Sequence, residues 1–213
     1  NGDGTVTHRI TGLTWMRCAI GMTWDGSTCT GTANSYTWDE AATLTTAFAG
    51  KSDWRLPSIA ELNTIVEWGG VESVTINSTV FPNAIVLNKD IGGQPLQYWS
   101  ASNVKAWGLV GSKWLLEFYQ GTLRPSYGVD THTVRLVSTN QAFDPSATYT
   151  PTTDFIDHGD GTVTHRKTGL VWKRCAEGQT WDVSTCAGTA ARYDWDTAKV
   201  LTSSSGGYSD WRL

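Results

Sequence analysis

The aromatic residues between positions 99 and 127 are the side chains best suited to bind a ligand. Exposed aromatic rings stack on sugar faces, and their polar edges and neighbours can hydrogen-bond hydroxyls. Trp99, Trp114 and Phe118 alternate as buried strand residues do, so we expect them in the core. The remaining candidates for a glycan site or a packing interface are Asn103, Lys105, Trp107, Tyr119, Arg124 and Tyr127.

Four cysteines form two sets with the same spacing. Cys18 and Cys29 are 11 residues apart, and Cys175 and Cys186 repeat this distance. Pairing within each set is the economical interpretation, because each disulfide would close its own short loop and stabilise it by roughly 2 to 3 kcal/mol. Disulfides indicate an oxidising, extracellular compartment. A zinc site is the alternative, although no Cys-x-x-Cys motif and no pair of histidines lies nearby.

Several charged residues have a structural interpretation. Asp53 and Arg55 could bind a ligand as a pair, but we favour an ion pair, buried or half-buried, that fixes the second predicted helix against the sheet. Trp54 between them is expected in the core, and Arg135 in the last strand is given a similar structural role. The cysteines are not accompanied by a catalytic histidine, so we expect no enzyme, and we expect neither a metal site nor a cofactor.

The composition excludes several classes of protein. Sixteen Lys and Arg stand against 20 Asp and Glu, which gives a formal net charge of -4, whereas a nucleic-acid-binding protein needs a basic surface. No apolar run approaches the roughly 18 residues of a membrane span. Charged residues make up only 17% of the chain, while Gly (22) and Trp (12) are abundant, a composition common in extracellular β-rich proteins.

The chain contains a repeat with an offset of 157 residues. Residues 2–56 align without a gap to residues 159–213, and 37 of these 55 positions are identical. This similarity implies duplicated domains of one fold. We expect a nearly complete first repeat over residues 1–138, a linker with Thr and Pro over residues 139–154, and the N-terminal part of a second, truncated repeat over residues 155–213. Further residues of the same chain, or a neighbouring subunit, would complete the second repeat.

The predicted elements of the first repeat place the aromatic candidates on an antiparallel sheet. Capping-box signatures that begin at Thr37 and Ser58 predict helices through about Ala47 and Trp68. The sequence therefore predicts an α+β domain with two helices and a sheet that brings its first and last strands together. Strands are expected over residues 5–8, 13–17, 98–102, 113–119, 123–126 and 133–138.

Seven motifs follow one another along the first repeat: Gly-Asp-Gly-Thr-Val-Thr (2–7), Thr-Gly-Leu-Thr-Trp-Met-Arg-Cys (11–18), Tyr-Thr-Trp-Asp-Glu-Ala (36–41), Asp-Trp-Arg-Leu-Pro-Ser-Ile-Ala-Glu-Leu (53–62), Phe-Pro-Asn (81–83), Tyr-Trp-Ser-Ala-Ser (98–102) and Val-Arg-Leu-Val (134–137). In these motifs the chain resembles one bacterial family, the C-terminal domain of the Legionella collagen-like adhesin. The motifs cover almost all of the first repeat, and the second repeat carries those that fall within it.

The resemblance implies a C-type-lectin-like fold, here in tandem repeat, on a secreted or surface-exposed protein. The adhesin that gives the family its name binds sulfated glycosaminoglycans and assembles as a trimer, which implies self-association and surface glycans as partners. Related formylglycine-generating enzymes need a late cysteine pair, whereas both cysteines of the repeat come early, so their activity is not carried over. We expect a non-enzymatic building block of a cell-surface fibre or adhesive assembly, with a lectin-like adhesin as the alternative.

Overall fold

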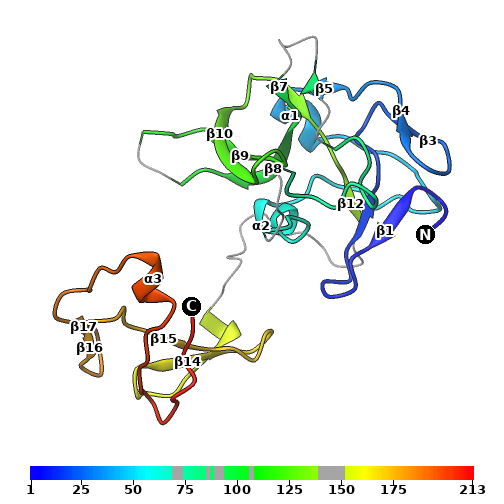
Figure 1. The fold of residues 1–213 in the computed structure, drawn as a ribbon. Helices are drawn as coiled ribbons and strands as arrows, with labels where there is room; N and C mark the ends of the chain where they lie inside the picture. The colour runs from blue at the N-terminus through cyan, green and yellow to red at the C-terminus, as the bar shows by residue number, and fades with distance from the viewer. Residues whose placement is uncertain (69–73, 85–86, 89–93, 106–107, 139–151) are drawn as a thin grey trace. The chain divides into compact units, whose positions relative to one another are not determined.

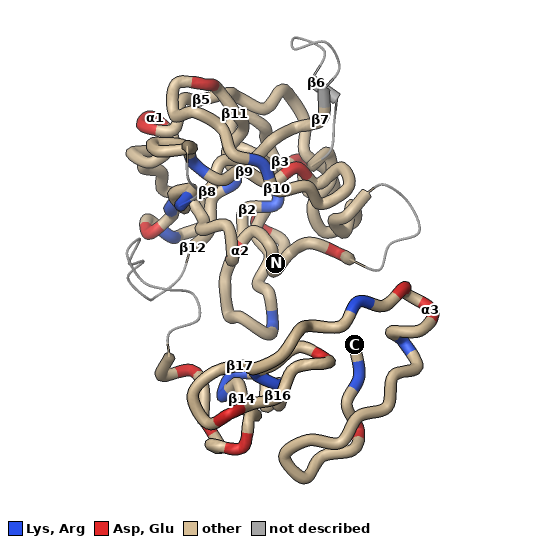
Figure 2. The backbone as a smooth tube through the Cα atoms, turned by 90° about the vertical axis from the view of Figure 1, so that its left-hand side faces the viewer, with Lys and Arg blue, Asp and Glu red and all other residues tan. Residues whose placement is uncertain are grey.

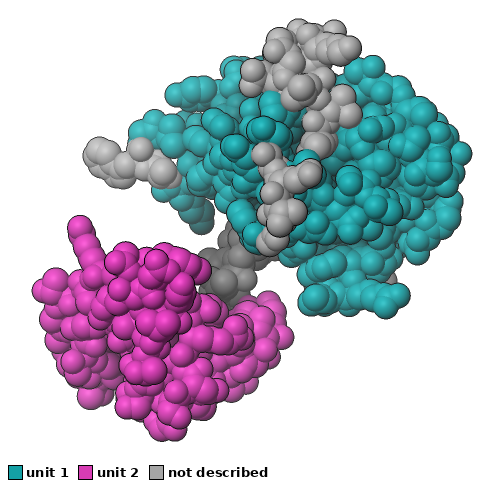
Figure 3. Space-filling model, in the orientation of Figure 1, with its two compact units in different colours: residues 1–146 teal, residues 147–213 magenta. Residues whose placement is uncertain are grey.

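The computed structural model describes residues 1–68, 74–84, 87–88, 94–105, 108–138 and 152–213. The chain divides into two compact units, Asn1–Ser146 (unit 1) and Ala147–Leu213 (unit 2), which Figure 3 shows in different colours. Most of the predicted linker, residues 139–151, lies outside the described part. Among the described residues, no helix has the length and apolar character needed to cross a bilayer.

Unit 1 begins with a hairpin that the end of the unit closes. Strand β1 (Thr5–Thr7) pairs antiparallel with β2 (Thr14–Met16), and β12 (Val137–Ser138) pairs with the other edge of β2. The order β1-β2-β12 places the first and last strands of the unit in one sheet, with β2 between them (Figure 1). The meeting of the two ends of the unit, which the sequence predicts, is therefore present.

A second sheet of unit 1 carries most of the candidate binding residues. Its strand order is β10-β9-β8-β11-β5, and Figure 1 shows β8, β9 and β10 side by side. Strand β11 runs parallel to β8, and the other neighbours are antiparallel. The bounds are β5 (Ser35–Tyr36), β8 (Gln97–Asn103), β9 (Ser112–Glu117), β10 (Thr122–Tyr127) and β11 (His132–Thr133).

Two small hairpins and a disulfide complete unit 1. The hairpins pair β3 (Thr23–Trp24) with β4 (Cys29–Thr30), and β6 (Leu87–Asn88) with β7 (Gln94–Pro95). Cys18 and Cys29 form a disulfide that ties β4, the second strand of the β3-β4 hairpin, to the chain just after β2. This cross-link fixes a loop-rich segment that has little regular secondary structure of its own.

Both predicted helices form, but each is much shorter than expected. Helix α1 (Trp38–Ala42) and helix α2 (Ile59–Asn63) begin with the predicted capping boxes at Thr37 and Ser58. Each helix ends at a threonine whose hydroxyl donates to carbonyl oxygens of the preceding turn: Thr43 to Asp39 and Glu40, and Thr64 to Glu61. Such bonds compete with helix continuation, and β-branched residues follow in both segments.

The predicted fold class is wrong. Three α-helices of four or five residues occur in the described residues, and most of the regular structure is in several small β-sheets. One-turn helices cannot form a layer that covers a sheet, so the chain has neither the two-helix α+β architecture nor the C-type-lectin-like fold expected from the sequence.

The core of unit 1 consists of two clusters on opposite faces of β8 and β9. Tyr98 and Leu116 belong to one cluster, and Trp99 and Leu115 belong to the other. Both faces of these strands are therefore covered. Trp99 and Phe118 are fully buried as predicted, whereas Trp114 is only half-buried.

Arg135 is a cation enclosed in this core, with 1% of its surface exposed. Its Nη1 donates to the carbonyl oxygens of Met16, at 2.8 Å, and Arg17. Its guanidinium carbon lies 5.0 Å from the ring centroid of Phe81 and 5.3 Å from that of Tyr98. Within the described part of the chain it forms no ion pair. Backbone carbonyls and aromatic faces thus replace the water that a buried charge loses.

Unit 2 repeats the start of unit 1 and adds a strand before it. The sheet order is β13-β14-β15, so β13 pairs with β14 on the edge away from β15. A disulfide joins Cys175 and Cys186, as in the first repeat. The elements are the 3-10 helix η2 (Thr152–Asp154), β13 (Phe155–Asp157), β14 (Thr162–His165), β15 (Val171–Lys173), β16 (Thr180–Trp181), β17 (Cys186–Ala187) and α3 (Trp195–Ala198).

Replacing Arg135 with Met tests its structural role. Arg135→Met leaves two buried carbonyls without their donor, so we expect the free energy of unfolding of unit 1 to fall by about 2 to 4 kcal/mol. Arg9→Met is the matched control, because Arg9 is exposed and forms no ion pair with the described residues, so its loss should cost less than about 1 kcal/mol. Urea unfolding followed by near-UV circular dichroism measures both; equal losses would contradict the assignment.

Candidate functional site

A cation held on an indole ring lies at one end of the five-stranded sheet. Lys113, near the start of β9, places its Nζ 3.5 Å from the ring centroid of Trp38 and donates to Oδ1 of Asn103 at 2.6 Å. Trp38 is the first residue of α1, and its Nε1 donates to the carbonyl oxygen of Ser100 at 2.8 Å. The ring is therefore held at its edge by β8 while one face carries the ammonium group.

A second polar group lies beside this pair because of the hairpin register. Ser126 of β10 is directly opposite Lys113 of β9. The Ser126 hydroxyl donates to Oδ2 of Asp130 at 2.7 Å and lies 2.8 Å from Nε2 of His132. The backbone N–H of Tyr127 donates to the same Asp130 oxygen at 3.1 Å. One carboxylate thus orders the turn between β10 and β11.

These residues lie at one end of the five-stranded sheet, and we call them the Lys113 patch. The N–H of Trp38 donates to the carbonyl oxygen of Gly128 at 2.9 Å, and this bond brings α1 against the turn between β10 and β11. Tyr127 is 59% exposed, so a ring face is open to solvent. The patch consists of Trp38, Asn103, Lys113, Ser126, Tyr127, Asp130 and His132.

Burial shifts the ionisation of two groups of the patch. Desolvation lowers the pKa of Lys113, and the nearby carboxylate of Asp39 opposes this effect. Desolvation also lowers the pKa of His132, against the opposing charge of Asp130. The His132 ring is packed edge-on against Trp99, with 4.6 Å between the ring centroids. Both shifts follow from partial removal of water around the two side chains, which favours the neutral forms.

The structure brings together only some of the predicted binding residues. Asn103 and Tyr127 belong to the patch. Lys105 is exposed, and it lies close to the start of β9 because the N–H of its neighbour Val104 donates to the carbonyl oxygen of Ser112. Trp107 lies outside the described residues. These positions cluster because the ends of β8 and β10 both lie beside the start of β9.

Tyr119 and Arg124 lie apart from the patch. Tyr119 precedes the turn at the opposite end of the β9-β10 hairpin. The six residues of β10, about 17 Å of strand, therefore separate Tyr119 from Tyr127, the patch residue at the end of β10. Arg124 lies in the middle of β10, where its Nε is 3.5 Å from Oε2 of the buried Glu117. The six predicted residues therefore do not form a single site.

The residues predicted to be structural are placed around the second helix. Arg55 forms a two-pronged ion pair with Glu61, with nitrogen–oxygen distances of 2.7 and 2.9 Å. Burial alone would raise the pKa of Glu61, but hydrogen bonds from Arg55 and from the Ser58 N–H lower it. Asp53 accepts a hydrogen bond from the Ser138 hydroxyl at 2.7 Å, and Trp54 is buried. These contacts tie α2 to the last strand.

Sequence reasoning missed five residues of the patch as site residues: Trp38, Lys113, Ser126, Asp130 and His132. Their contacts join segments that are far apart in the chain, and no short motif marks them. One signal was available: the spacing of Ser126 and Asp130 around Gly128 suits a tight turn held by a carboxylate. In the described part of the chain, no three His, Cys, Asp or Glu side chains are arranged to hold a metal ion.

The comparisons with known proteins give one family. The family model described as the Lcl C-terminal domain matches residues 4–138, which include every residue of the Lys113 patch. No curated protein matches the chain.

The pH dependence of His132 tests the packing of the patch. We expect its pKa in the folded protein to lie below the ordinary 6.5, because burial beside Trp99 disfavours the charged ring. As the pH falls below 6.5, His132 binds its second ring proton in the unfolded chain before it does so in the folded protein. The contribution of neutral His132 to stability is therefore present above pH 6.5 and is lost as the pH falls through the lowered pKa. An NMR titration of the imidazole signals measures the pKa of His132, and the His132→Gln variant identifies which signal belongs to this residue. A pKa above 6.5 would contradict the packing.

Proposed function

Because the chain belongs to the Lcl C-terminal domain family, we propose that unit 1 is a non-enzymatic adhesive domain that binds surface glycans through the Lys113 patch. The family and the two disulfides fit a surface-associated protein. The extracellular location that we propose follows from the same two observations, since disulfides persist in oxidising compartments.

The observation that carries this proposal is the exposed Tyr127 ring, whose main-chain N–H is held by Asp130 at the same end of the sheet as Lys113 and Asn103. Sugars present apolar C–H faces and rims of hydroxyls, so an open ring with polar neighbours suits both parts of the ligand. The Lys113 ammonium and the Asp130 carboxylate are each already oriented by contacts within the protein. Preorganised groups lose less conformational entropy on binding than free side chains do.

The charge around the patch indicates which glycans fit. Lys113 is a cation of the patch and Asp130 is its carboxylate, while Asp39 lies close to Lys113 and the exposed Lys105 follows β8. The Arg124 guanidinium already has a carboxylate partner in Glu117. Figure 2 shows that basic and acidic residues are interspersed along the chain, and the net charge is -4. This balance favours hydroxyl-rich glycans, recognised by stacking and hydrogen bonds, over densely sulfated polymers.

A building block of a cell-surface fibre is the second candidate, and the tandem repetition of one sequence favours it. Repeated units carried on one chain can present several contact surfaces at once, which strengthens weak contacts through avidity. Light scattering on the full chain at high concentration tests this candidate, because a fibre subunit should form oligomers. A chain that stays monomeric would contradict it.

Two tyrosine variants test the glycan proposal. Tyr127→Ala removes the exposed ring of the patch, so we expect the affinity for the best ligand on a glycan array to fall by about tenfold or more. Tyr119→Ala is the matched control, because it removes a ring at the other end of the hairpin and should leave binding unchanged. Circular dichroism confirms that both variants fold. Equal affinities of the wild type and Tyr127→Ala would exclude this surface as the binding site.

A further inference from the structure

Strand β10 presents three exposed apolar side chains on one face of the five-stranded sheet. Leu123, Pro125 and Tyr127 alternate along the strand, so their side chains point to the same face. Leu123 is 43% exposed, and Pro125 is exposed as well. The strand lies at an edge of the sheet (Figure 1), so these side chains follow the rim of the sheet for about 13 Å.

Trp68 extends this set at the end of β10 where the hairpin turns. Leu62 and Ile65, which precede it, belong to the same buried cluster as Leu116 of β9. Leu116 pairs directly with Leu123, so this part of the chain lies on the face that carries the three exposed side chains. Trp68 itself is 64% exposed. We call the residues Trp68, Leu123, Pro125 and Tyr127 the β10 row.

A glycine in the hairpin turn provides the seat of the Trp68 ring. Gly121 lies between β9 and β10 with a φ of +65°. A Cβ atom at this position would lie 3.1 Å from Cζ3 and 3.3 Å from Cη2 of Trp68, so a larger residue would push the ring away. The indole is therefore held against the main chain of the turn, although most of the residue remains open to solvent.

The free edge of β10 is poorly suited to pair with a polypeptide strand. In an antiparallel pair, every second residue turns its main-chain N–H and C=O away from the partner strand. On β10 these are Leu123, Pro125 and Tyr127, because Pro125 has no N–H to give to β9 and the Tyr127 N–H donates to Asp130 instead. A peptide added at this edge would find an interrupted set of donors. The β10 row therefore suits a ligand that is recognised by ring stacking rather than by strand pairing.

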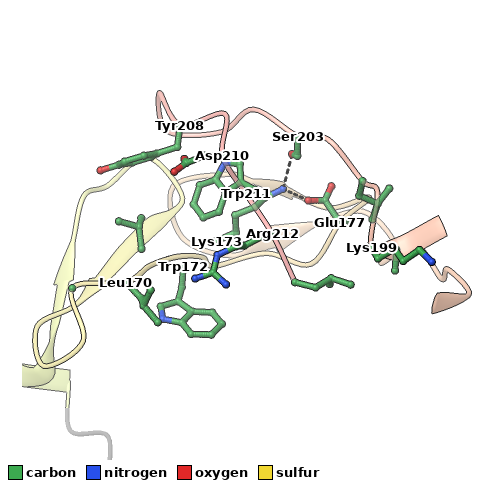
Figure 4. A pocket seen from close by; sticks show the side chains of 15 residues that line it. Leu170, Trp172, Lys173, Glu177, Lys199, Ser203, Tyr208, Asp210, Trp211 and Arg212 are labelled. Carbon is green, nitrogen blue, oxygen red and sulfur yellow. Dashed lines mark hydrogen bonds and ion pairs between the residues drawn. The ribbon is translucent and has the colours of Figure 1, made fainter. Parts of the chain in front are cut away.

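The exposed rings of unit 2 belong to a different kind of surface. An open groove of about 540 Å³ beside β15 is lined by Trp172 and Trp211, among others (Figure 4). Their counterparts in unit 1, Trp15 and Trp54, are buried core residues. The groove thus marks core positions of the repeat, whereas the β10 row is exposed in the unit where those positions are covered.

We propose that the β10 row binds a neutral, β-1,4-linked polysaccharide that lies along the strand. The proposal rests on the glycan-binding function proposed above for Tyr127, and it names the class of glycan. Chains with this linkage are extended and flat, with hydroxyls at their edges and C–H groups on their faces. The rings of Tyr127 and Trp68 stack on sugars at two points of one chain, and Leu123 and Pro125 contact the stretch between them.

The charges near the β10 row favour a neutral chain over a sulfated one. None of its four residues is charged, and Glu67, the neighbour of Trp68, is exposed. Arg124 points to the opposite face of β10, where its Nε lies 3.5 Å from the Glu117 carboxylate. A sulfated polymer along the row would meet a carboxylate without a cation to offset it.

Calorimetric titration of the full chain with oligosaccharides tests the proposal. The probes are cellohexaose and chitohexaose, which are both neutral and β-1,4-linked, together with the disaccharide of each series. We expect at least one hexasaccharide to bind saturably, and about tenfold or more tightly than its disaccharide, because only the longer chain contacts both rings. The series that binds distinguishes a glucan from a polymer of N-acetylglucosamine. Maltohexaose, the α-1,4-linked isomer of cellohexaose, controls for chain shape and should bind at least about tenfold more weakly than the bound hexasaccharide.

Two tryptophan variants locate the site. Trp68→Ala should lower the affinity for the hexasaccharide about tenfold, because it removes one of the two stacking rings. Trp195→Ala is the matched control, because it removes an indole of unit 2 that is 72% exposed, and it should leave binding unchanged. Circular dichroism checks that both variants fold.

Three outcomes would overturn the proposal: neither hexasaccharide binds saturably, maltohexaose binds as tightly as the β-linked chains, or Trp68→Ala binds the hexasaccharide as the wild type does. The glycan-binding function of Tyr127 is judged separately, by the glycan array with Tyr127→Ala. A ligand lost in Tyr127→Ala but retained in Trp68→Ala would support that function and reject the β10 row as an extended site.

Discussion

The attachment of the last segment of unit 1 to β2 is the contact on which the rest of the unit depends. Arg135 joins this segment to the backbone of β2 from inside the core. The segment then exchanges main-chain bonds with Arg55, whose ion pair with Glu61 fixes α2. Val137 lies in one core cluster, while Val134 lies in the other. One short stretch therefore connects both clusters, the first hairpin and the second helix.

The Lys113 patch rests on the same attachment. Strand β11 directly precedes the closing segment and pairs with both β5 and β8, which sets His132 against Trp99. The five-stranded sheet then aligns Ser126 with Lys113 by register alone. The small helices act mainly as supports for single side chains, of which Trp38 is the clearest case. A rigid strand framework with short connections is well suited to hold polar groups ready for a ligand.

Local features of the fold could be predicted from the sequence, whereas contacts between distant segments could not. The capping boxes are contacts over three residues, and both form. The helices end early because the hydroxyls of Thr43 and Thr64 bond back to the preceding turn, an outcome that apolar periodicity does not indicate. The separation of Tyr119 from Tyr127 depends on hairpin length, and the stacking of Lys113 on an indole 75 positions earlier in the chain has no local signal.

Hydrogen exchange at two equivalent amides tests the role of the closing segment most directly. The Met16 N–H donates to Leu136, so its exchange should be slow and limited by opening of unit 1. Lys173 stands at the position of Met16 in the second repeat, and no strand of the described residues pairs with its edge of β15, so its N–H should exchange much faster. Equal protection of the two amides would contradict the account, because it would mean that unit 2 holds this edge without a closing strand.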